Sequence, residues 1–165
     1  MIKSFIFENF KSFEKTELNI ESLTTLIGTN ASGKSNAIEG ITILAKAATG
    51  IDLSTILDGT KSTGTVVRGG SRGCARFKTN SFKLGCLIDF DETKDLLYEI
   101  KIAVGDRVGI EEEGLYLVKR DSLGPKSNKV FKTKKAESGR AEIKVQYKNG
   151  NKWLLKCVEI QKMRE

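Results

Sequence analysis

The chain has 165 residues, of which 39% are hydrophobic and 30% charged. That length can bury a core without disulfides, as one domain or as a small core with an appended lobe, and the composition excludes disorder across the whole chain. No stretch approaches the roughly 18 apolar residues that a membrane-spanning helix needs, and Lys3, Glu8 and Lys11 interrupt any signal peptide. We therefore expect a soluble, cytoplasmic protein with no membrane partner.

The net charge is +7, and the chain contains three cysteines and no histidine. The cysteines, at 74, 86 and 157, fit neither zinc ligation nor an even set of disulfides. The absence of histidine also removes the commonest general base. The positive charge permits a polyanionic partner such as nucleic acid, although a well-solvated basic surface explains it equally well.

The first half of the chain predicts strands, then a loop and a helix. Residues 2–8 are rich in β-formers and predict a strand, 9–12 a turn, and 13–20 a second strand paired with the first as a hairpin. The short apolar run 23–27 ends at Gly28 and predicts a buried strand.

From Gly33 onward the spacing of apolar residues changes to that of a helix. Its predicted apolar face is formed by Ile38, Ile41, Leu44, Ala45 and Ala48, and Gly50 is the expected stop. Residues 50–73 are rich in Gly, Ser and Thr and predict a loop with a short helical turn at 53–57.

The second half of the chain predicts an antiparallel meander with one solvated face. A strong hairpin turn is expected at 148–151, because Asn and Gly accept positive φ. The expected strands are 82–90, 97–104, 107–112, 114–120, 128–133, 141–148 and 152–160.

The phosphate-binding pattern GxxxxGK(S/T) is matched by the run Gly28-Thr29-Asn30-Ala31-Ser32-Gly33-Lys34-Ser35. Glycines let such a loop wrap closely around phosphate oxygens, and its N–H groups together with the helix N-terminus attract anions. Lys34 is expected to reach the β- and γ-phosphates as the catalytic cation, and Ser35 to place its hydroxyl on Mg²⁺. The loop predicts ATP with Mg²⁺, bound by Asn30, Ala31, Ser32, Gly33, Lys34, Ser35 and Asn36.

The segment Asn9-Phe10-Lys11-Ser12-Phe13, followed by the phosphate loop and Asn36, resembles the start of the ABC-type ATPases of DNA maintenance, the SMC, RecF and OLD proteins. Residues 67–70 resemble the arginine-bearing loop of SMC heads, and 82–160 the antiparallel lobe of OLD-type ATPases. The resemblance implies that Lys11 and Ser12 lie near the nucleotide, that Arg68 lies near nucleotide or DNA, and that two heads sandwich ATP.

Several motifs of that family have no clear counterpart in residues 1–165. No apolar strand ending in Asp-Glu is evident, and residues 88–92 come closest to a Walker B strand. There is no signature sequence and no switch histidine, and Gln161 is a candidate Q-loop glutamine. We therefore expect the N-terminal part of a larger ATPase, with hydrolysis dependent on residues outside this chain.

The predicted fold is α/β: the N-terminal core of a P-loop NTPase of the ABC-ATPase head type, at residues 1–73, with an antiparallel β lobe at 74–165, forming an incomplete domain. The expected function is an ATP-binding head acting on or near DNA, in repair or anti-phage defence beside a nuclease, with homo-oligomerisation through the heads. A basic run from Lys119 to Lys156 favours a polyanion partner. The alternatives are an ATP-dependent protein-assembly module without DNA contact and a nucleotide-binding subunit of a transporter.

Overall fold

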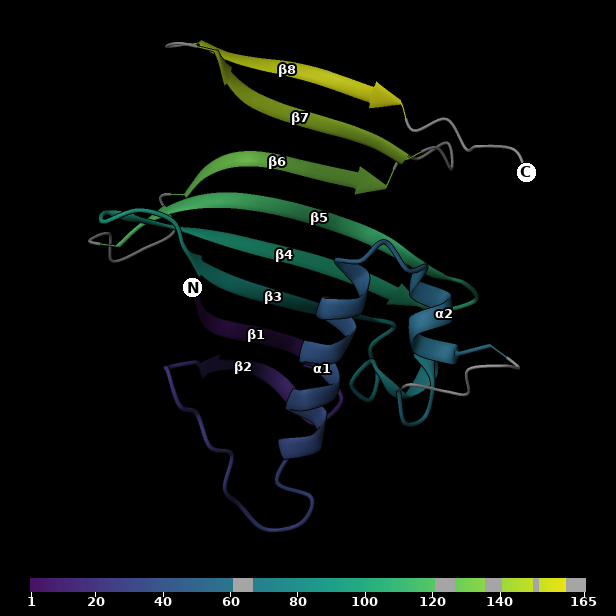
Figure 1. The fold of residues 1–165 in the computed structure, drawn as a ribbon. Coiled ribbons are helices and arrows are strands. Elements are labelled where there is room, and N and C mark those ends of the chain that lie inside the picture. Colours follow the sequence, from purple (N-terminus) through teal and green to yellow (C-terminus); the bar gives the residue numbers. More distant parts are fainter. Residues whose placement is uncertain (61–66, 121–126, 136–140, 150–151, 160–165) are drawn as a thin grey trace.

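The computed structural model describes residues 1–60, 67–120, 127–135, 141–149 and 152–159. The strands form one sheet in the order β2-β1-β3-β4-β5-β6-β7-β8, and every neighbouring pair is antiparallel. Two helices, α1 and α2, lie on one face of this sheet (Figure 1). Among the described residues, no helix has the length and apolar character that crossing a membrane requires.

The N-terminal hairpin has the predicted form. Strand β1 (Ile2–Phe10) pairs with β2 (Phe13–Asn19), and only Lys11 and Ser12 separate the facing pair Phe10 and Phe13. The turn is held from outside: the Lys11 N–H donates to the Cys74 carbonyl oxygen at 2.8 Å, and Phe10 bridges to Ala75. The segment just before β3 is therefore fixed against the hairpin turn.

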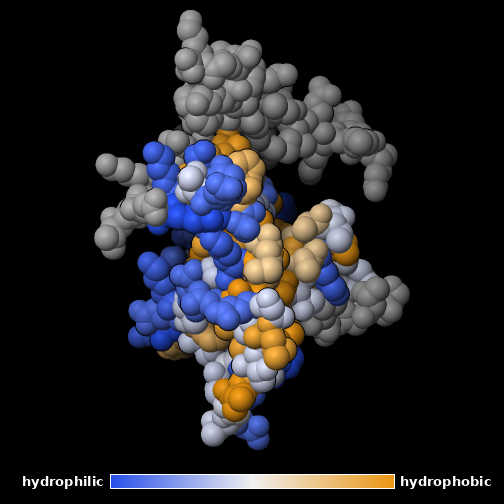
Figure 2. Space-filling view, turned by 60° about the vertical axis from the view of Figure 1, so that its left-hand side comes forward, coloured by the Kyte–Doolittle hydropathy of each residue, from blue (hydrophilic) through white to orange (hydrophobic). Residues whose placement is uncertain are grey.

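The predicted strand at 23–27 is wrong. These residues form no strand, and Leu23 and Ile27 are 86% and 90% exposed. Figure 2 shows hydrophobic surface at the lower end of the molecule, where Figure 1 places the segment between β2 and α1. A short apolar run becomes a strand only when a neighbour pairs with it, and both edges of β1 are already taken, by β2 and β3.

The helix after the phosphate loop is α1 (Lys34–Ala47), and its buried face agrees only in part with the predicted one, since Leu44 is buried and Ile41 packs against the core as predicted. The buried residues are Ala37, Gly40, Ile43 and Leu44. Ile38 is 57% exposed, and Ala45 and Ala48 are also exposed. The aromatic rings under the helix contribute to this shift, because Phe7 and Phe10 leave no room for a side chain at residue 40.

The segment after α1 contains the predicted helical turn. It is α2 (Leu53–Asp58), whose first turn is capped by the Asp52 carboxylate accepting from the N–H groups of Ser54 and Thr55. Ile56 and Leu57 are buried against the sheet. A single 3-10 turn, η1 (Ser71–Gly73), then leads toward β3.

The remaining strands form the predicted meander. Their bounds are β3 Ser81–Asp89, β4 Lys94–Val104, β5 Val108–Lys119, β6 Ser127–Lys135, β7 Ala141–Asn149 and β8 Lys152–Glu159. The two strands predicted at 107–112 and 114–120 are one strand. The register between β4 and β5 shifts at Lys101/Ile102, so Glu111 is an extra residue in the ladder and β5 continues past it.

The two faces of the sheet differ in character. Under the helices lies a core that includes the packed rings of Phe7, Phe10 and Phe82. On the other face Lys83 pairs with both Glu8 and Glu99 across three strands, in line with the predicted solvated face. The sheet runs without a break through both predicted regions, and a domain boundary after residue 73 stays a prediction.

Candidate functional site

The phosphate loop, residues 28–35, joins the exposed segment to the first turn of α1. Ala31 and Gly33 adopt positive φ angles of 63° and 94°, which turn the chain tightly into the helix. A Cβ added at Gly33 would lie 3.1 Å from two ring atoms of Phe13. Glycine at 33 therefore serves both the backbone conformation and the close approach of the loop to the hairpin.

The loop surrounds a small polar cavity of about 360 Å³. The cavity is lined by Asn30, Ala31, Ser32, Gly33, Lys34, Ser35, Asn36 and Arg68. No side chain of the described residues caps α1, and its first-turn N–H groups lack intrahelical acceptors. A helix start of this kind binds anions, so the cavity suits phosphate groups.

Lys34 turns back over its own loop. Its Nζ donates to the carbonyl oxygens of Gly28 at 2.7 Å and Thr29 at 2.6 Å, and to the Ser32 hydroxyl at 3.2 Å. These three acceptors hold the ammonium group against the loop, and Lys34 is one of the residues that line the cavity. A phosphate oxygen entering the loop would have to replace one or more of these acceptors.

A chain of hydrogen bonds connects the loop helix to two other segments. Asn36 donates from Nδ2 to the Ser12 hydroxyl at 2.9 Å and accepts from Arg68 Nη2 at 3.3 Å. Glu39 accepts from Arg68 Nε at 2.6 Å and from Lys11 Nζ. Lys11 also donates to the Arg68 carbonyl oxygen at 3.0 Å. The hairpin turn, α1 and the loop after Val67 therefore meet in one network.

The residues predicted from the resemblance are brought together in this network. Arg68 lines the phosphate cavity, whereas Lys11 is not among the residues that line it and has a side chain only 9% exposed. Ser12 contacts the loop helix through Asn36 and lies 3.4 Å from a Cβ placed on Gly33. Their roles toward a nucleotide stay predictions.

Glu39 is the member of the network that sequence reasoning missed. Burial alone raises the pKa of its carboxyl, but the hydrogen bonds from Lys11 and Arg68 outweigh burial and hold the pKa below its ordinary value. Glu39 is therefore an anion at neutral pH. Its spacing of three residues from Asn36 places the two on one side of α1, and that spacing was the available signal.

Few of the described residues are suited to bind Mg²⁺ at this cavity. Ser35 is exposed at the cavity, and its hydroxyl is suited to a hard cation together with phosphate oxygens and water. The described residues contain no group of three or more acidic, Cys or His side chains that could hold a metal ion. Of the described residues that line the cavity, Ser35 is therefore our candidate to contribute to Mg²⁺ binding.

The acidic run at 88–92 does not reach the site. The Asp89 N–H donates to the Met1 carbonyl oxygen, so this run lies at the start of β1, whereas the phosphate loop packs beyond its far end at Phe13. The Asp89 carboxylate pairs with Arg120. The weak resemblance of residues 88–92 to a Walker B strand is therefore wrong for this site, and Gln161 lies outside the described residues.

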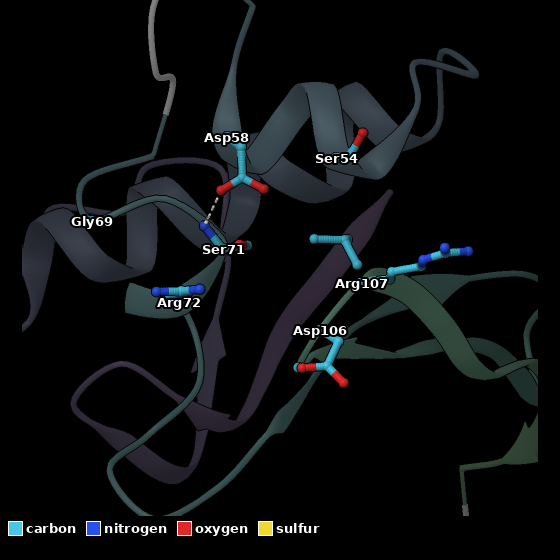
Figure 3. A pocket seen from close by; sticks show the side chains of 9 residues that line it. Ser54, Asp58, Gly69, Ser71, Arg72, Asp106 and Arg107 are labelled. Carbon is cyan, nitrogen blue, oxygen red and sulfur yellow. Dashed lines mark hydrogen bonds between the residues drawn. The ribbon is translucent and has the colours of Figure 1, made fainter.

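A second cavity, of about 510 Å³, is lined by residues of α2, of the segment 69–72 and of the turn between β4 and β5 (Figure 3). Asp58 at the end of α2 accepts from the Ser71 N–H at 2.7 Å, and Asp106 and Arg107 lie across the cavity from this pair. The charged side chains on its wall are two arginines and two aspartates, from Asp58, Arg72, Asp106 and Arg107. Their charges balance, so the cavity favours neither cations nor anions.

Comparison with known proteins places the chain in a family. The AAA ATPase domain family matches residues 1–163, nearly the whole chain, and is consistent with a P-loop NTPase of the SMC/RecF-like group. No curated protein and no solved structure matches the chain. The match agrees with the phosphate loop, the anion-binding start of α1 and the placement of Lys34. The chain belongs to the AAA ATPase domain family, and this membership implies a P-loop NTPase fold and ATP binding.

Proposed function

We propose that residues 28–36 bind the phosphates of ATP with Mg²⁺, and that the chain is the ATP-binding head of a DNA-associated ABC-type ATPase. The observation that carries the proposal is the position of Lys34, whose ammonium group is held within the loop by three oxygen acceptors and which lines the same cavity as the uncapped start of α1. That arrangement offers a cation and aligned N–H groups to one anion.

The catalytic part of the proposal is limited to binding and charge stabilisation. Lys34 would neutralise charge that develops on the β- and γ-phosphates, while Ser35 would orient Mg²⁺. The sequence has no clear Asp-Glu pair after an apolar strand to supply a general base. We propose that hydrolysis uses a carboxylate from outside residues 1–165 and that two heads assemble around ATP.

The test is ATP affinity measured by calorimetry in the presence of Mg²⁺ for the wild type and for Lys34→Ala. We expect the variant to lose about tenfold or more in affinity, because it removes a charge-assisted contact. Lys46→Ala is the matched control, a lysine in the last turn of the same helix, and should bind like the wild type. Equal affinity for Lys34→Ala and the wild type would contradict nucleotide binding at this loop.

DNA contact rests on the net charge of +7 and on the basic run from Lys119 to Lys156. We expect DNA affinity to fall steeply as salt rises, because lysines that neutralise phosphates release counterions. Fluorescence anisotropy with labelled duplex at several salt concentrations measures the slope. A flat response would remove DNA from the proposal, and ATP-dependent dimerisation without phosphate release would favour the protein-assembly alternative.

A further inference from the structure

Glu39 joins two cations that come from distant parts of the chain. Lys11 stands 28 residues before it in the hairpin turn, and Arg68 stands 29 residues after it. The Glu39 side chain is 15% exposed, whereas that of Arg68 is 67% exposed. The carboxylate is thus anchored inside the network, and the guanidinium it holds faces solvent.

The position of Arg68 explains why this matters for a phosphate ligand. Among the described residues that line the phosphate cavity, Arg68 alone comes from outside the loop and the first turn of α1. Its guanidinium therefore reaches the cavity from a different segment than the groups of the loop. Nε and Nη2 are engaged by Glu39 and Asn36, which fixes the plane of the guanidinium.

The charges of the network leave Arg68 available to a second anion. Glu39 carries one negative charge against the two positive charges of Lys11 and Arg68. Because Lys11 remains beside Glu39, the carboxylate keeps a counterion when the guanidinium also binds phosphate. The Glu39–Arg68 ion pair therefore need not break when phosphate binds to Arg68, because Lys11 also neutralises Glu39.

We propose that Glu39 is a positioning residue that holds Arg68 where the guanidinium meets the outermost phosphate, so that the site prefers a nucleoside triphosphate to a diphosphate. This inference rests on the proposed nucleotide binding at residues 28–36. It assigns to Glu39 the discrimination between the two ligands, while Lys34 and the helix start bind the phosphates that both ligands share.

The test compares the dissociation constants for ATP and ADP, measured by calorimetry with Mg²⁺ on the full chain. Glu39→Gln and Arg68→Gln should each weaken ATP binding by about tenfold and change ADP binding by less than about twofold. The double variant should be no weaker than either single variant, because both remove the same contact. If Glu39→Gln fails to fold, Glu39→Asp is used instead. The shorter carboxylate keeps a negative charge for Lys11 but lies farther from Arg68.

Asp95→Asn is the matched control. Asp95 is also a carboxylate held between a lysine and an arginine, Lys3 and Arg120, and its side chain is 8% exposed. Removing its charge should affect stability in a similar way and leave the ratio of ATP to ADP affinity unchanged. If Glu39→Gln leaves the ratio of ATP to ADP affinity unchanged, for example by weakening the binding of both nucleotides equally, the positioning role alone is overturned. A wild type that binds neither nucleotide would overturn the proposed function and this inference together.

Discussion

The backbone of α1 packs on the ring of Phe7 at Gly40, where an added Cβ would lie 2.6 Å from the ring atom Cε1. The same Cβ would lie 3.2 Å from Phe10. Phe7 and Phe10 are fully buried, so neither ring can move aside. Gly40 therefore sets how closely the helix that begins in the phosphate loop approaches the sheet.

Gly40→Ala should destabilise the protein despite the better helix propensity of alanine. The propensity gain is about 1 kcal/mol, whereas overpacking a core costs about 1–3 kcal/mol and the contact here is severe. We expect a net loss of about 1 kcal/mol or more, measured by urea denaturation. Gly109→Ala is the control, because a Cβ there meets no atom within 4 Å, and it should be close to neutral. Wild-type stability for Gly40→Ala would show that the helix can lift off the rings.

Gly33→Ala should lower both stability and nucleotide affinity. Its φ of 94° costs an alanine about 1–2 kcal/mol, and the new Cβ would press on Phe13. Gly50→Ala separates the two causes, because Gly50 has a φ of 80° but open space around it. The extra loss in Gly33→Ala measures the Phe13 contact. If Gly33→Ala binds ATP as tightly as the wild type, the loop tolerates a side chain at residue 33.

The stability of the protein should fall in acid because two carboxyls are held ionised. Burial raises the pKa of each, but hydrogen bonds from cations outweigh it and lower the pKa of Glu39 and Asp95 below their ordinary values of 4.5 and 3.8. A lowered pKa means that the unfolded chain binds protons more readily. The stabilisation is complete above these ordinary values and is lost as the pH falls through the lower folded ones.

Denaturation curves between pH 7 and pH 3 measure this loss. Asp95→Asn and Glu39→Gln should each be less stable at pH 7 and show a flatter decline below pH 4.5. A decline as steep as that of the wild type in both variants would show that other carboxyls govern acid unfolding.

Cys74 should resist thiol reagents while the protein is folded. The side chain is fully buried, Sγ donates to the Gly70 carbonyl oxygen at 3.3 Å, and burial raises the pKa of the thiol to about 12. The reactive thiolate is therefore scarce at pH 8. Mass spectrometry after brief alkylation should find Cys74 unmodified, and modified once denaturant is added. Rapid labelling in the native protein would indicate that the arginine loop opens.

The sequence predicted those parts of the fold that local chemistry determines. The hairpin, α2 and the meander follow from alternation and turn residues, and the phosphate loop follows from its motif. Residues 23–27 could not be predicted correctly, because a strand depends on partners elsewhere in the chain. The face of α1 was partly misassigned because apolar counting passes over Gly40, which the rings of Phe7 and Phe10 select for its lack of a side chain.

The candidate site divides in the same way. Residues 30–36 are adjacent in sequence and follow from the motif, whereas Lys11, Ser12 and Arg68 were suggested only by resemblance to a family. Neither the motif nor the resemblance pointed to Glu39, because a glutamate on a helix is ordinarily a solvated residue. Its partners become visible only when the Cys74–Arg76 segment is docked on the hairpin end, which brings the arginine loop to α1.

Residues 23–27 belong to no described strand, and this has a practical consequence for handling the protein. In this segment, exposed aliphatic side chains lie beside backbone that pairs with no described strand. Such backbone can pair with an extended segment of another molecule. Concentrated samples should therefore self-associate through this segment before the core unfolds. A charged residue at Leu23, which is 86% exposed, would protect solubility at little cost to stability.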